Sequence, residues 1–157
     1  MNANNDIKVF IDTNNLIWQK YNAGSLKKIL SSDEEKETAI IKIEENFTLN
    51  PDSKINSVEI FVLDGVYTNE FGEFEAGTYL KFPKEDESFV KAKKSCTIFR
   101  KINYLYNDEK IIIDTNLASW MQGYGNLEVM PLYESTALVK WPKGGVFVPH
   151  KHWGGEF

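Results

Sequence analysis

The sequence has a single cysteine, only two histidines and no long apolar segment among its 157 residues. One cysteine excludes an internal disulfide, which favours a reducing compartment, so we expect a cytoplasmic protein. No stretch approaches the roughly eighteen apolar residues of a membrane span, and the polar start lacks a secretory signal, so no membrane association is predicted. The net charge of -5 offers no basic surface to DNA or RNA, which argues against a nucleic-acid partner.

Aromatic residues (13%) and β-branched residues are plentiful, and both types favour strands. Short runs at regular spacing predict an all-β sandwich or barrel, with strands at residues 38–43, 59–63, 78–82, 96–100 and 110–114, a hairpin over 66–76 and a solvated loop at 84–87. Asp64-Gly65 predicts a turn that ends the second strand, and residues 15–30 leave room for one irregular helical turn. Cys96 is predicted to be a small buried side chain.

The chain repeats part of itself. The pentapeptide TAIIK at 38–42 returns as TALVK at 136–140, and IDTN at 11–14 returns as IDTN at 113–116. A unit of about a hundred residues is too long for a solenoid repeat, so the pattern indicates a duplicated domain. We therefore expect a complete unit at residues 1–106 and the first half of a second unit at residues 107–157.

Three segments carry a resemblance to a known family. They are EIFVLDGV at 59–66, FGEFEAGTY at 71–79 and CTIF at 96–99, together with the His-x-His-x-x-x-Glu pattern near the C-terminus. They resemble the ChrR-type cupins, which include the cupin domain of ChrR anti-sigma factors and acetylacetone-cleaving dioxygenases, many with two cupin units in tandem. The resemblance implies a cupin-type jelly-roll barrel with an additional truncated half-repeat of strands.

The resemblance also implies a metal site built from two histidines, a glutamate and a later histidine. In the complete unit these four positions hold Asp52, Lys54, Val58 and, for the later histidine, Ser88 or its neighbour. A protonated lysine repels a cation and valine has no donor atom, so we expect no metal or other cofactor in this unit. Glu59 stays as a nearby carboxylate, with a structural role as the preferred interpretation.

The C-terminal motif has the donors that the complete unit lacks. His150, His152 and Glu156 have the types and spacing of a facial triad, which binds iron or, more generally, a divalent metal such as zinc. Three interpretations stay open: a remnant of a tandem protein, which we favour, a metal-binding tail, and a catalytic centre. No residue is assigned a catalytic role.

The half-repeat contains apolar residues that need a covering surface: Leu132, Val139, Trp141, Val146 and Phe147. Exposed strand edges and apolar side chains promote association, so we predict a homodimer whose interface includes residues 132–149. The favoured function is a non-catalytic module that binds a small molecule or a protein. The alternative is a metal-dependent, dioxygenase-like enzyme that uses the C-terminal motif.

Overall fold

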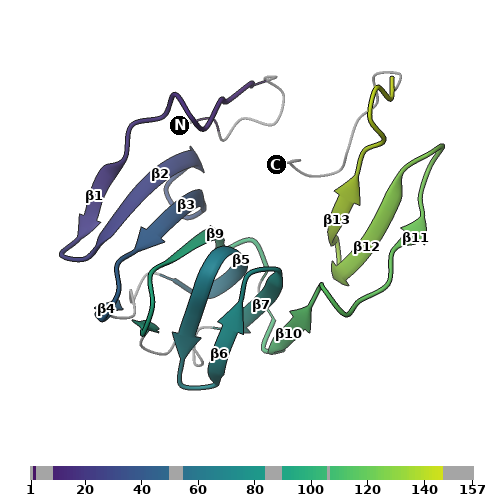
Figure 1. Cartoon of the computed structure of the whole chain (residues 1–157). Coiled ribbons are helices and arrows are strands. Elements are labelled where there is room, and N and C mark those ends of the chain that lie inside the picture. Colours follow the sequence, from purple (N-terminus) through teal and green to yellow (C-terminus); the bar gives the residue numbers. More distant parts are fainter. Residues whose placement is uncertain (1, 3–8, 50–54, 84–89, 106, 147–157) are drawn as a thin grey trace. The chain divides into compact units, whose positions relative to one another are not determined.

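The computed structural model describes residues 2, 9–49, 55–83, 90–105 and 107–146 (Figure 1). These residues form strands and turns, so the predicted all-β fold is confirmed for the part of the chain that is described. Within these ranges no helix has the length and apolar character needed to cross a membrane. The chain divides into two compact units, Met1–Asp114 and Thr115–Phe157.

The first unit is built around one large antiparallel sheet. Its described strands are β1 (Gln19–Asn22), β2 (Ser25–Ser32), β3 (Glu37–Ile43), β4 (Phe47–Leu49), β5 (Ser57–Asn69), β6 (Gly72–Glu75), β7 (Thr78–Pro83), β8 (Val90–Ala92), β9 (Cys96–Ile102) and β10 (Ile111–Asp114). The sheet has the order β1-β2-β3-β9-β5-β7-β10, β6 pairs with β5, and β4 pairs with β8 separately. As described, the large sheet is open and ends at β1 and β10; it is not a closed barrel, but its strand arrangement is consistent with the predicted jelly roll.

One face of this sheet forms the core, and we call it the interior face. Register places Ile41, Ile98 and Val62 next to one another across β3, β9 and β5, and none of them is more than 2% exposed. Alternation along each strand sends every second side chain to this face. The β4–β8 pair and the β5–β6 hairpin contribute to the same core, through Phe47, Ala92, Tyr67 and Phe74.

The Asp64-Gly65 pair does not end a strand, so this prediction was wrong. β5 runs on to Asn69, and its register against β9 shifts between Val62 and Asp64. Gly65 has a φ of 76°, and a Cβ there would lie 2.1 Å from the Ser95 carbonyl oxygen. The pair therefore forms a bulge, through which β5 leaves β7 and turns toward β6.

The helical turn considered for residues 15–30 is also absent. This segment instead forms the β1–β2 hairpin, with Gly24 in the turn between the two strands. A Cβ on Gly24 would lie 2.2 Å from the Phe47 ring, so the glycine permits a close approach that the local pattern did not indicate.

The remaining strand predictions for the described residues are confirmed. β3, β7, β9 and β10 match the predicted runs, Pro83 closes β7, and β5 and β6 form the predicted hairpin. Cys96 is 1% exposed on the interior face, as predicted. The predicted loop at 84–87 lies outside the described residues.

The second unit contains a small antiparallel sheet of β11 (Met121–Gln122), β12 (Glu128–Tyr133) and β13 (Thr136–Lys140), in that order. Its register repeats that of β1, β2 and β3. The pair Lys27–Ile41 corresponds to the pair Val129–Val139. The residue numbers are therefore offset by 102 between β2 and β12 and by 98 between β3 and β13. Each hairpin also has a register shift just before its turn. The two offsets therefore differ because the β2–β3 turn is longer.

Candidate functional site

The position that corresponds to the family's metal-binding glutamate lies in the apolar core. Val58 is 6% exposed on the interior face and pairs with Phe82 on one side and Ile102 on the other. Among the described residues no group of three or more His, Cys, Asp or Glu is placed to hold a metal ion. The described part of the position therefore does not fit a divalent metal.

The other residues singled out for metal binding cannot be placed in the same way. Asp52, Lys54 and Ser88 lie outside the described residues, as do the C-terminal residues His150, His152 and Glu156. The absence of a metal from the first unit and the metal-binding tail both stay predictions.

Glu59 is turned away from the interior face and is held by partners. Its side chain is only 5% exposed; Oε1 accepts a 2.8 Å hydrogen bond from the Tyr79 hydroxyl, and Oε2 lies 3.3 Å from Nζ of Lys101. A buried carboxylate with a hydroxyl donor and a cation beside it fits a structural role. It offers no ligand toward Val58.

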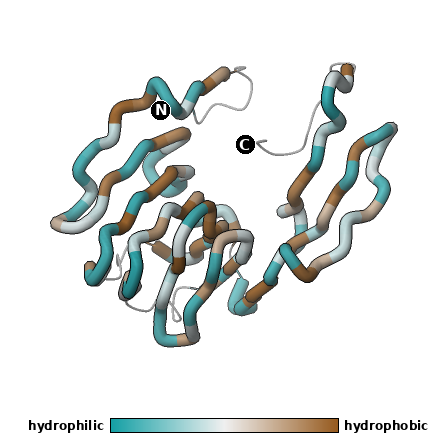
Figure 2. The backbone as a smooth tube through the Cα atoms, in the orientation of Figure 1, coloured by the Kyte–Doolittle hydropathy of each residue, from teal (hydrophilic) through white to brown (hydrophobic). Residues whose placement is uncertain are grey.

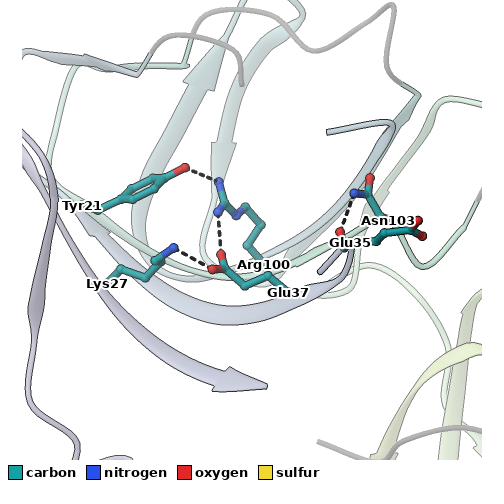
Figure 3. A network of polar contacts seen from close by, with 6 residues as sticks. All are labelled: Tyr21, Lys27, Glu35, Glu37, Arg100 and Asn103. Carbon is teal, nitrogen blue, oxygen red and sulfur yellow. Dashed lines mark hydrogen bonds and ion pairs between the residues drawn. The ribbon is translucent and has the colours of Figure 1, made fainter. Parts of the chain in front are cut away.

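The interior face instead carries a cluster of polar side chains that the sequence did not reveal. Figure 3 shows Tyr21, Lys27, Glu37 and Arg100 converging from β1, β2, β3 and β9. Register explains their direction, because Lys27 pairs with the buried Ile41 and Arg100 follows Ile98 in the alternation of β9. We call these four residues the interior polar cluster.

Glu37 holds two cations at once in this cluster. Its Oε2 lies 2.6 Å from Nζ of Lys27, and its Oε1 accepts a 2.9 Å bond from Arg100, whose other terminal nitrogen lies 3.3 Å from the Tyr21 hydroxyl. The three charged side chains are only 10% to 15% exposed, so water screens them poorly. Two cations share one carboxylate, which leaves the cluster with a net positive charge.

Arg100 is the most buried member of the cluster and is held in its charged form. Burial by itself lowers the pKa of Arg100, but the contacts with Tyr21 and Glu37 outweigh it and raise the pKa above its ordinary value. Both cations lie close to the Tyr21 ring, with Lys27 Nζ 4.5 Å from its centroid. Among the described residues, Nε of Arg100 has no hydrogen-bond partner.

Two further buried polar residues, Asn103 and Lys81, have structural roles. Asn103, with a φ of 63°, accepts a bond of 2.7 Å from the Asn56 amide and donates one of 2.6 Å to the Glu35 carbonyl, so it joins β5 to the turn before β3 (Figure 3). Lys81 is fully buried and donates to carbonyl oxygens of Asn107 and Glu109, which fixes the segment before β10. Neither site offers a free group to a ligand.

An antiparallel sheet of this order, with a core on one face and no helix among the described residues, defines a cupin-type jelly roll. Residues 6–105 match the family described as the ChrR Cupin-like domain. The chain belongs to this family, and the resemblance seen in the sequence is confirmed. Among curated proteins, no sequence matches the chain significantly.

Solved structures agree with the fold. The complex of SigE with the anti-sigma ChrR from Rhodobacter sphaeroides matches with 18% identity and a TM-score of 0.52, over 59% of this chain and 52% of that chain. A putative dioxygenase from Nostoc punctiforme matches with 13% identity and a TM-score of 0.57, over 76% of this chain and 53% of that chain. The chain thus spans about half the length of these structures, and at such identities the likeness concerns the fold alone.

Proposed function

We propose that the first unit is a metal-independent binding module whose interior face takes a small organic anion, such as a carboxylate. One observation carries this proposal: the family's glutamate position is the apolar Val58, while the largely buried charged groups described on the same face are Lys27, Arg100 and one acceptor, Glu37. An excess of donors with positive charge favours an anionic ligand over a cation.

The geometry of Arg100 supports a carboxylate in particular. Its terminal nitrogens donate to Glu37 and Tyr21, whereas Nε has no hydrogen-bond partner among the described residues, and a poorly screened cation gains more from contact with an anion than an exposed one. The aromatic and aliphatic side chains of the same core suit the apolar part of a ligand. A binding role of this kind requires no catalytic residue.

Calorimetric titration with succinate and benzoate, alongside the neutral amides succinamide and benzamide, tests the proposal. We expect heat from the carboxylates only, with unchanged affinity after treatment with EDTA. Lys27→Met should weaken binding by about tenfold or more, the size of a lost charged hydrogen bond. Lys42→Met is the matched control, because Lys42 is exposed on the opposite face of β3.

Two outcomes overturn the proposal. One is the absence of binding by any carboxylate at millimolar concentration. The other is equal affinity of the amides and the acids, which means that the cluster serves the fold only. Circular dichroism of Lys27→Met shows whether a loss of binding reflects a loss of folding.

A protein partner is the second candidate, favoured by one comparison. ChrR is bound to SigE in the structure from Rhodobacter sphaeroides. This candidate fits the second unit, where exposed apolar residues gather among the described residues.

A further inference from the structure

The repeated register makes each position of the small sheet comparable with one in the first unit. Ala39, Ile41 and Ile43 of β3 are each fully buried on the interior face. With the offset of 98 residues between β3 and β13, their counterparts are Ala137, Val139 and Trp141. Of these, Val139 is 41% exposed and Trp141 is 45% exposed. A face that forms core in the first unit is thus open to solvent in the second.

The rest of this face is apolar as well. Register adds Met121, Val129 and Pro131 on the same side, and Met121 is 54% exposed. At the counterparts of Met121 and Val129 the first unit has the polar residues Gln19 and Lys27. We call the six residues the exposed β11–β13 face; its members are Met121, Val129, Pro131, Ala137, Val139 and Trp141.

Exposure of this kind is concentrated in the second unit. Of the twelve large hydrophobic residues found exposed in the described chain, seven lie between Leu117 and Val146. Figure 2 shows brown, hydrophobic stretches along β12 and β13. Contiguous apolar surface on a soluble protein marks an interaction site.

We infer that a second copy of this chain covers the exposed β11–β13 face, with the two small sheets packed face to face about a two-fold axis. The counterpart face in the first unit is covered by apolar side chains, so the face fits an apolar sheet surface, and a second copy supplies one. The exposed β11–β13 face has no charged side chain among its six members, so two copies of it can meet without charge repulsion and without burying an unpaired charge. Face-to-face sheets pack about 10 Å apart, as in β-sandwiches.

The test is the oligomeric state of the full chain, measured by sedimentation velocity between about 1 and 100 μM. We expect wild type to dimerise within this range and Val139→Glu to stay monomeric, with association weakened by at least a hundredfold. Trp141 supplies a second signal, because its fluorescence emission should shift to longer wavelength as wild type is diluted. Leu63→Glu is the matched control: Leu63 is 45% exposed but lies on β5 of the first unit.

Three results overturn the inference: wild type monomeric at 100 μM, Val139→Glu still dimeric, or Leu63→Glu monomeric. In the first case, hydrogen exchange of β13 in the full chain and in a chain ending at residue 146 identifies intramolecular cover by residues 147–157. If Val139→Glu fails to fold by circular dichroism, Met121→Lys replaces it, because Met121 is more exposed than Val139 or Trp141.

Discussion

Glu37→Gln is the most informative single change, because one carboxylate holds two buried cations. The amide keeps the shape but removes the charge that lies 2.6 Å from Lys27 and 2.9 Å from Arg100. Removing one partner of a buried ion pair destabilises proteins by about 3–5 kcal/mol, since the remaining charge stays buried without compensation. For a chain of this length, about 2–4 °C per kcal/mol gives a fall in melting temperature of roughly 6–20 °C.

The assay is urea unfolding followed by circular dichroism, with Glu128→Gln as the matched control. Glu128 pairs with Lys140 at 2.8 Å, but their side chains are 46% and 60% exposed, so this pair should contribute less than about 1 kcal/mol. A Glu37→Gln loss equal to that of Glu128→Gln would refute the claim that the cluster is poorly screened. The same variant should bind succinate more tightly, because Glu37 no longer competes for the two cations.

Three further predictions concern the bulge, the thiol and the C-terminal motif. Gly65→Ala should destabilise the fold by more than about 2 kcal/mol through its clash with the Ser95 carbonyl, whereas Gly144→Ala, with a similar φ but open space around it, should lose only about 1 kcal/mol in the same urea assay. Burial, with a smaller effect of Asp64, raises the pKa of the Cys96 thiol to about 11, so a disulfide reagent at pH 8 should label it only after unfolding, and stability should fall as pH rises from 9 toward 11 because the unfolded thiol ionises first. Zinc titrated into wild type should show at most weak binding, which should disappear below a pH of about 6.5. Identical heats for wild type and His150→Ala would identify the motif as a remnant.

Alternation and turn residues predicted six of the thirteen described strands, because both signals are local. β3, β7 and β9 each combine β-branched or aromatic residues with a clear boundary, such as Pro83 after β7. The Asp64-Gly65 pair failed because the same dipeptide serves a tight turn and a bulge, and the choice depends on β9 and Ser95, which are distant in sequence. The prediction for residues 15–30 missed the β1–β2 hairpin for the same reason, because the role of Gly24 depends on its close approach to Phe47, which is distant in sequence.

The interior polar cluster had no local signal of its own. Lys27, Glu37 and Arg100 are spread over more than seventy residues, and each looks like an ordinary solvated charge in its own strand. One clue was present for Arg100: it continues the alternation of Cys96 and Ile98, so its side chain had to face the core. A charged residue at an interior position of a predicted strand therefore points to a buried partner on another strand.

The cluster also bears on the choice between binding and metal chemistry in the first unit. Arg100 pairs with Ile60, so it is a diagonal neighbour of Val58, at roughly 7–8 Å across adjacent strands. A guanidinium carried on this neighbouring position repels a divalent cation, and Glu37 offsets only part of this repulsion because Lys27 also interacts with its charge. A dioxygenase-like activity would therefore have to place its metal at the C-terminal motif rather than beside Val58. The charge that opposes a metal in the first unit is the same charge that favours an organic anion there.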